Sequence, residues 1–279
     1  MAQWMEYPRE AVTGTLRVLQ DVHSPQLDNR RDLLVLLPPS WPEEGRRWPV
    51  LYMQDGQNLF DAATSFAGDW GVAETMEELS RKEIEAIVVG IPNTGSQRLD
   101  EYSPFHHPGH GGGKGDAYLE FLVSTVKPLV DAAFPTDPAR EATGILGSSM
   151  GGLISLYALF RRPDVFGLCG AMSPAFWFAH GALLDFVRHT PKVPARIYLD
   201  TGTREMPRIR FWRTSRRSSA SEMAAILRHK GYVEGTDLRY VVEKEGEHNE
   251  GAWRRRLPGA LRFLLGPRGP RQTTALARE

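Results

Sequence analysis

The chain has 279 residues, of which 41% are hydrophobic, and its formal net charge at pH 7 is zero. This length and composition allow one large hydrophobic core, and the neutral balance excludes a global basic field of the kind that attracts nucleic acid or an anionic membrane. We expect a single domain over residues 1–266 and a disordered tail over residues 267–279, which contains Pro267 and Pro270.

The cysteine content and the N-terminal segment indicate a cytoplasmic protein. Cys169 is the only cysteine, so no disulfide forms within the chain, which fits a reducing compartment. The first ten residues have neither a basic region nor an apolar stretch typical of a signal peptide. No apolar run approaches the length that spans a membrane.

The first third of the chain predicts an antiparallel start followed by alternating strands and helices. Two strand-like segments flank a turn-rich interval that suits a hairpin. Buried-strand patterns follow, with one helical pattern between them. The expected strands are 14–22, 32–37, 50–54 and 86–91, and the expected helix is 72–82.

Residues 92–115 are rich in Gly, Pro and His and predict a long loop, which is the length usually reserved for function or disorder. Helical spacing returns over 118–134, despite Pro128. The alternation then resumes with strands at 143–146, 167–172, 195–199 and 238–242 and helices after Ser149 and at 181–189, 218–230 and 250–265. This pattern predicts an α/β fold with a mainly parallel twisted sheet, antiparallel N-terminal strands and helices on both faces.

A G-x-S-x-G motif runs from Gly147 to Gly151, at the junction of an apolar strand and an apolar helix. In such a motif the serine lies on a sharp strand-to-helix turn, and the flanking glycines leave room for close backbone packing. The helix that follows directs its N–H groups at the same point, where they would stabilise developing negative charge. Ser149 is therefore the candidate nucleophile.

A serine nucleophile needs a base, and His248 is the best-placed histidine. It follows the last predicted strand and precedes the C-terminal helix, in the position that the chain order serine, acid, histidine requires. His106, His107 and His110 cluster in the long loop, but no further ligands with a recognisable spacing accompany them. We predict no metal site.

Two carboxylates are candidates for the acid that orients the base. Asp200 continues the apolar strand and can still belong to it, whereas Glu205 stands beyond a glycine turn, from which a side chain can reach a histidine. Glu205 is preferred, and Asp200 stays open as the alternative.

The oxyanion hole requires two backbone N–H donors that are in place before the reaction. Met150 supplies one, because it follows the nucleophile. Gln57 is the expected second donor, since it lies in the turn Asp55-Gly56-Gln57 at the end of an earlier strand.

Several segments in this order resemble the esterase branch of the α/β-hydrolases, which includes enterochelin-type siderophore esterases and feruloyl-esterase domains. The matching segments are 51–61, 68–70, 147–152, 201–205 and 247–249, and the resemblance extends from about residue 33 to residue 265. It implies the α/β-hydrolase fold. It also implies that the acid lies in the loop Gly202-Thr203-Arg204-Glu205 and that Gln57 provides an oxyanion donor.

Residues that contact the substrate are expected near these segments. The candidates are Asp69, Trp70, Arg98, Tyr102 and Arg204. Arg204 begins a basic stretch that extends to Arg217 and contains Phe211 and Trp212, and this stretch suits either a pocket wall for an anionic or aromatic group or a solvated surface.

The sequence thus predicts a serine carboxylic-ester hydrolase that acts through an acyl-enzyme and needs no cofactor. Its expected partner is a small-molecule ester, with no nucleic acid or membrane, and assembly into a homo-oligomer is left open. Two alternatives use the same fold. One is an acyltransferase with the same triad, and the other is a catalytically silent binding module.

Overall fold

The computed structural model describes residues 3–8, 13–205 and 213–267. Residues 206–212 of the basic stretch, with Phe211 and Trp212, and residues 268–279 of the tail lie outside these ranges. The strands in these ranges are β1 (Met5–Glu6), β2 (Thr15–Ser24), β3 (Asn29–Leu37), β4 (Val50–Gln54), β5 (Ile87–Ile91), β6 (Thr143–Ser148), β7 (Leu168–Met172), β8 (Arg196–Gly202) and β9 (Leu238–Glu243).

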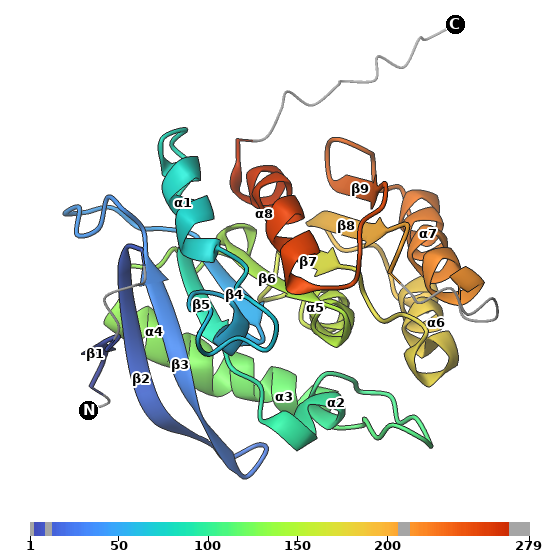
Figure 1. Cartoon of the computed structure of the whole chain (residues 1–279), viewed down its shortest axis with the longest axis horizontal. Coiled ribbons are helices and arrows are strands. Elements are labelled where there is room, and N and C mark those ends of the chain that lie inside the picture. Colours follow the sequence, from blue (N-terminus) through green and yellow to red (C-terminus); the bar gives the residue numbers. More distant parts are fainter. Residues whose placement is uncertain (1–2, 9–12, 206–212, 268–279) are drawn as a thin grey trace, which may run out of the picture.

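These strands form one sheet in the order β1-β2-β3-β5-β4-β6-β7-β8-β9 (Figure 1). Strands β1, β2, β3 and β5 pair antiparallel, and every pairing from β5 through β4 to β9 is parallel. The expected mainly parallel sheet with an antiparallel N-terminal part is therefore confirmed.

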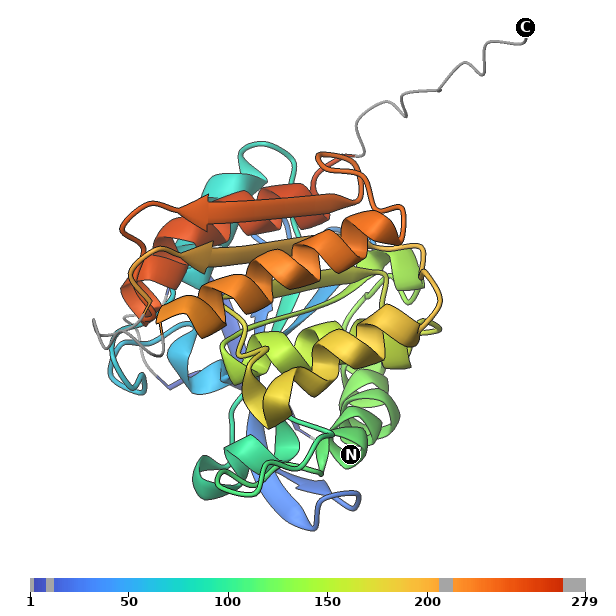
Figure 2. The ribbon, with the colours of Figure 1, turned by 90° about the vertical axis from the view of Figure 1, so that its right-hand side faces the viewer.

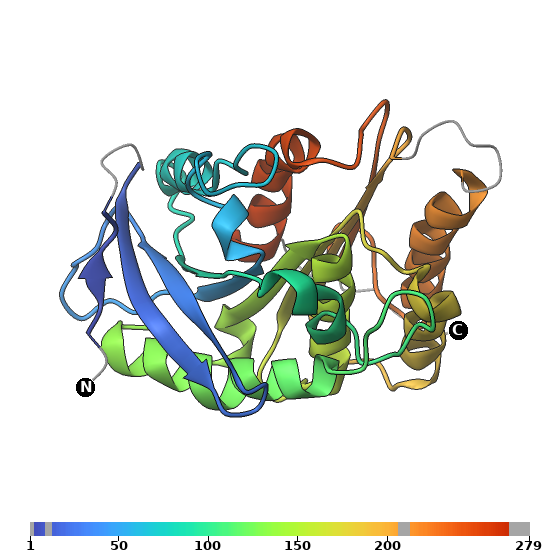
Figure 3. The same cartoon turned by 60° about the horizontal axis from the view of Figure 1, so that its bottom comes forward.

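Helices cover both faces of the sheet (Figures 1 and 3). Helices α1 and α8 lie on one face of the sheet, and helices α3 to α7 lie on the other. On that second face α6 and α7 run side by side (Figure 2). The helix bounds are α1 (Val72–Ser80), α2 (Arg98–Glu101), α3 (Gly115–Phe121), α4 (Lys127–Ala133), α5 (Met150–Arg161), α6 (Ala182–His189), α7 (Arg213–His229) and α8 (Glu250–Leu265).

Alternating side chains of the central strands pack into two separate hydrophobic cores, one on each face of the sheet. Leu51 and Met53 of β4 pack with α1 and α8, while Val50 and Tyr52 pack with the helices of the other face. Because successive side chains of a strand point to opposite faces, a strand that is apolar throughout has to be covered on both sides. The continuous apolar runs in the sequence are explained by these two layers.

The structure refines two predicted segments. The interval 92–115 is not a plain loop, because it contains a short 3₁₀ turn (Gly95–Gln97) and α2. The helix predicted over 118–134 consists of α3 and α4 joined by a π-helical turn (Leu122–Val126), with Pro128 in the first turn of α4. Proline lacks an N–H group and crowds the carbonyl four residues earlier, and the wider turn accommodates it.

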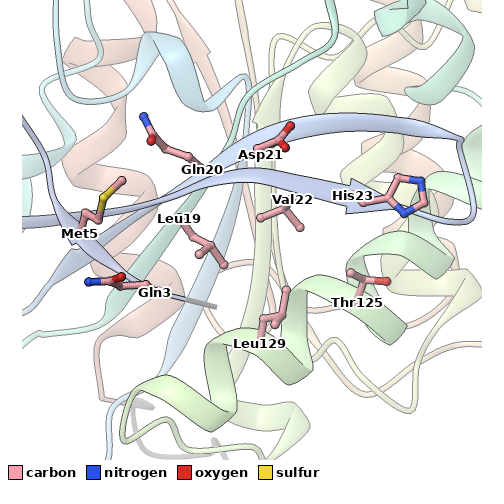
Figure 4. A pocket seen from close by; sticks show the side chains of 9 residues that line it. All are labelled: Gln3, Met5, Leu19, Gln20, Asp21, Val22, His23, Thr125 and Leu129. Atoms are coloured by element: carbon pink, nitrogen blue, oxygen red, sulfur yellow. The ribbon is translucent and has the colours of Figure 1, made fainter. Parts of the chain in front are cut away.

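A hollow of about 470 Å³ lies beside the N-terminal strands (Figure 4). Its lining residues come from the first strands and from the segment around α4, and they are Gln3, Met5, Leu19, Gln20, Asp21, Val22, His23, Thr125 and Leu129. None of the candidate site residues contributes to it. Within the described ranges, no helix is both long and apolar enough to cross a membrane.

Candidate active site

The candidate nucleophile lies on a strained turn between β6 and α5. Ser149 has φ 54° and ψ −119°, a conformation that residues other than glycine rarely adopt. Its N–H donates to the Met172 carbonyl at 3.0 Å, and its carbonyl accepts from the N–H of Ala175 at 2.9 Å. A Cβ on Gly147 would lie 2.6 Å from the Gly151 carbonyl carbon, so no larger residue fits at this position without a backbone shift. The turn is thus held by backbone contacts.

His248 lies just before α8, and its imidazole faces the serine. The Nε2 atom is 3.0 Å from the Oγ of Ser149. Asn249 begins the helix, and its side-chain oxygen accepts a hydrogen bond from the N–H of Ala252 at 2.9 Å, as a helix N-cap does. The indole of Trp253 packs edge-on against the imidazole with ring centroids 5.2 Å apart. These contacts set the position of the ring.

Glu205 faces the other nitrogen of the imidazole. Its Oε2 is 3.5 Å from Nδ1 of His248, at the outer limit of a hydrogen bond. Its Oε1 accepts hydrogen bonds from the Ser173 hydroxyl, at 2.5 Å, and from the Gly202 N–H. Burial alone would raise the pKa of Glu205, but His248 and these donors outweigh it and lower the pKa below its ordinary value.

Asp200, the alternative acid, belongs to β8 and is fully buried. Its Oδ1 accepts from the Ser173 N–H and from Nη1 of Arg256, both at 2.9 Å. Arg256 also lies 3.7 Å from Oε1 of Glu205, so its guanidinium stands between the two carboxylates. Burial raises the pKa of Asp200 to about 7, although Arg256 opposes this. Of the two acids, Glu205 is therefore the one beside His248.

Gln57 and Met150 both carry backbone N–H groups at the start of helical turns. Met150 is the first residue of α5, and Gln57 lies in the single 3₁₀ turn after β4 (Gly56–Asn58). The first N–H groups of a helix have no partner within it, so they are open to an acceptor from outside. A Cβ on Gly56 would lie 2.6 Å from the Gly90 carbonyl carbon, which explains the glycine.

Two of the expected substrate residues are engaged with the turn before Gln57. Arg98 pairs with both carboxylate oxygens of Asp55, at 2.7 and 2.8 Å. The Tyr102 hydroxyl accepts from the Asp55 N–H at 3.1 Å, and this tyrosine is fully buried. Asp55 itself has a left-handed backbone, with φ 55°. Arg98 and Tyr102 therefore hold the turn that carries Gln57.

The other expected substrate residues lie around α8 and the acid loop. Asp69 accepts from Arg254 at 2.6 Å and from the Gly71 N–H at 2.7 Å. Trp70 is buried and packs against Trp253 with ring centroids 5.6 Å apart. Arg204 is exposed and pairs with Glu245 at 2.8 Å.

Sequence reasoning missed three residues at this site: Ser173, Trp253 and Arg256. Ser173 immediately follows β7, and a polar residue at the carboxyl end of a parallel strand is a signal that could have indicated it. The sequence pattern of Trp253 and Arg256 is that of ordinary residues of an amphipathic helix, and only the packing of α8 brings them to Ser173.

The loop histidines form a cluster at the surface. The rings of His107 and His110 have centroids 4.6 Å apart, and His107 stacks on His180 at 5.5 Å. In the parts of the chain that the structure describes, no group of three or more His, Cys, Asp or Glu residues is arranged to hold a metal ion.

Comparison with known proteins matches residues 24–264 to a family described as "Putative esterase". The chain is 26% identical over 244 residues to the uncharacterized protein YbbA of Bacillus subtilis, covering 85% of this chain and 93% of that protein. It is 26% identical over 270 residues to the ferri-bacillibactin esterase BesA of the same bacterium, covering 87% and 88%.

A solved structure shares the fold. The IroE-like serine hydrolase from Shewanella oneidensis superposes with a TM-score of 0.72 and 20% identity, covering 90% of this chain and 80% of that one. The family match spans most of the chain. The chain therefore belongs to this esterase family and is a carboxylic-ester hydrolase, and its fold is that of the α/β-hydrolases.

Proposed function

We propose that the chain hydrolyses small carboxylic esters through an acyl-enzyme on Ser149, with His248 as the base and Glu205 as the acid of the triad. The observation that carries this proposal is the 3.0 Å contact between Nε2 of His248 and Oγ of Ser149. A serine hydroxyl is a weak nucleophile by itself, and a base within hydrogen-bond reach activates it.

In the first half of the reaction, Oγ of Ser149 attacks the ester carbonyl while its proton passes to Nε2 of His248. The imidazolium that forms is stabilised by Glu205 on the Nδ1 side. When the C–O bond of the ester breaks, His248 returns the proton to the leaving alcohol. Water then attacks the acyl-enzyme and gives a proton to His248. The bond between the acyl carbon and Oγ of Ser149 breaks, His248 returns the proton to Oγ, and the acid product leaves.

The negative charge on the carbonyl oxygen requires donors that are already in place, and we assign this role to the N–H groups of Gln57 and Met150. Arg98 and the Tyr102 hydroxyl both bond to Asp55 and so hold the turn that carries the Gln57 N–H. We therefore assign Arg98 and Tyr102 to holding the oxyanion turn, and Asp69 and Trp70 to holding α8, which follows His248. Arg204, which is exposed on the loop that carries Glu205, is proposed to contact the substrate.

Labelling with a fluorophosphonate probe tests this proposal. Such a probe reacts with an activated serine, so one equivalent should bind and peptide mapping should locate it on Ser149. Labelling of the His248→Ala variant should fall steeply, because the base is missing. Wild-type protein that hydrolyses esters without being labelled at Ser149 would contradict the acyl-enzyme. Since one relative is named a ferri-bacillibactin esterase, bacillibactin belongs in the substrate panel beside short alkyl and aryl esters.

A further inference from the structure

Ser173 occupies the centre of a buried hydrogen-bond network behind the proposed triad. The residue is 2% exposed and has φ 43°, so its backbone is in the left-handed region. Its hydroxyl contacts three side chains: Nε1 of Trp253 at 3.0 Å, Nη2 of Arg256 at 2.9 Å and Oε1 of Glu205 at 2.5 Å. A buried serine with a strained backbone and three polar contacts is unusual. These contacts determine which group accepts the hydroxyl proton.

The direction of each hydrogen bond follows from the donor inventory. An indole N–H and a guanidinium can only donate, so Trp253 and Arg256 occupy the two lone pairs of the Ser173 oxygen. A hydroxyl has one proton, and the third contact is the carboxylate of Glu205. The hydroxyl of Ser173 must therefore donate to Oε1 of Glu205.

This donation determines how Glu205 meets the histidine. Oε1 receives the Ser173 hydroxyl and the Gly202 N–H, which leaves Oε2 to face Nδ1 of His248. Two donors on one oxygen favour the ionised carboxylate over the acid. The arrangement therefore favours the ionised form of Glu205 and fixes its side-chain rotamer.

We propose that Ser173 is a positioning residue for the reaction, because two donors at its oxygen direct its proton to Glu205 and turn the free carboxylate oxygen toward His248. The inference rests on the proposed function of Glu205. The charged and titratable groups around this point are Arg256, Asp200, Glu205, Glu243 and His248.

The Ser173→Ala variant tests the proposal. We expect kcat to fall about tenfold with little change in KM, the size of effect of a hydrogen bond to a charged group. Ser173→Gly, which suits the left-handed backbone better, should lose the same activity and checks that Ala causes no misfolding.

A double variant shows whether Ser173 acts through the acid. In a Glu205→Gln background, Ser173→Ala should cost almost nothing further. Ser155→Ala removes another buried hydroxyl and serves as the control, with kcat unchanged. Wild-type kcat in Ser173→Ala, or losses that multiply in the double variant, would overturn the proposal. Hydrolysis that survives in Ser149→Ala would instead remove the proposed function itself, so the two failures are distinguishable.

A second inference comes from an exposed aromatic ring near the oxyanion turn. Phe66 is 91% exposed, although its loop is tied down. Its N–H donates to Oδ1 of Asn58 at 3.1 Å, and the Thr64 hydroxyl donates to the Gln57 carbonyl at 2.8 Å. Asn58 also contacts Glu250, two residues after His248, at 3.4 Å. The loop therefore links the proposed oxyanion donor with the start of α8.

We propose that Phe66 binds an apolar or aromatic part of the ester held at Ser149. A phenyl ring in water is unfavourable, and a ligand that covers it gains the free energy of that burial. The backbone of Phe66 is bonded to Asn58, which follows Gln57 and contacts Glu250 at the start of α8, so a substrate held at this turn is the proposed occupant. This inference also rests on the proposed function.

A series of esters with growing apolar groups tests this role. For the Phe66→Ala variant we expect KM to rise about tenfold for p-nitrophenyl octanoate and to stay unchanged for p-nitrophenyl acetate, with kcat for the acetate unchanged. Val233→Ala removes another exposed apolar side chain and is the control. Equal KM values across the series in wild type and Phe66→Ala, or a loss of kcat for every ester, would overturn the proposal.

Discussion

The two carboxylates near His248 differ in their surroundings. Glu205 receives two donors on one oxygen and faces the imidazole with the other, so its pKa is lowered against the effect of burial. Asp200 is buried in β8 beside Arg256, and its pKa is raised. The sequence placed both within range of the histidine, and only their positions relative to the end of β8 separate them.

Replacing each acid with its amide compares their roles. We expect Glu205→Gln to lower kcat by about 10³-fold, because the amide no longer stabilises the imidazolium. Asp200→Asn should cost less than about tenfold, since this side chain acts on the triad only through Arg256 and Ser173. Steady-state kinetics on p-nitrophenyl acetate measures both. A larger loss in Asp200→Asn would assign the acid role to Asp200.

The buried Asp200 also predicts how stability depends on pH. In the unfolded chain this carboxyl loses its proton near its ordinary pKa of 3.8, whereas in the folded protein it keeps it until about pH 7. The folded state thus binds the extra proton between these values, and the contribution of Asp200 to the free energy of unfolding falls as the pH rises through this window.

Urea unfolding at pH 5 and pH 8 checks this sign. Wild type should lose more stability between the two pH values than Asp200→Asn, which has no proton to release there. Equal pH dependence in the two proteins would contradict the raised pKa.

At the scale of elements, the loops that follow β8 and β9 are locked together by backbone contacts. The Arg204 N–H donates to the Gly246 carbonyl at 2.8 Å, and the Thr203 N–H donates to the Glu243 carbonyl at 3.0 Å. These bonds bring the loop with Glu205 against the loop with His248, so main-chain atoms set the distance between these two residues.

Gly202→Ala should disturb this contact. A Cβ at Gly202 would lie 2.2 Å from the Gly246 carbonyl oxygen, so the backbone must move. We expect kcat to fall at least tenfold, because a displacement of about 1 Å at a catalytic group costs up to 10²-fold. Gly259→Ala in α8, where nothing lies within 4 Å, is the matched control and should keep full activity. Unchanged kcat in Gly202→Ala would contradict the claim that close contact between the loops after β8 and β9 positions Glu205 and His248.

At the scale of the whole molecule, much of the fold was predictable because each strand carries its own signal. The apolar runs of the parallel strands and the helical spacing between them gave the α/β class, and the resemblance of ordered motifs gave the family, which the family match confirms. Local patterns suffice here because burial on both faces leaves a continuous apolar run in the sequence.

The candidate site was only partly predictable. Ser149, Glu205 and His248 each follow a strand of the parallel sheet, and the structure brings them together within 3.5 Å contacts. The roles of Arg98 and Tyr102 were not predictable, because their bonds to Asp55 depend on how α2 packs under the turn. The network around Ser173 likewise depends on the packing of α8 and leaves no pattern in the chain.

The central claim is that Ser149 is the nucleophile, and hydrolysis of p-nitrophenyl acetate by Ser149→Ala tests it most directly. The neighbouring Ser148 is buried at the end of β6 and provides the matched control. We predict that Ser149→Ala loses at least about 10³-fold in kcat while keeping its unfolding midpoint, and that Ser148→Ala stays active. Hydrolysis at the wild-type rate by Ser149→Ala would contradict the account.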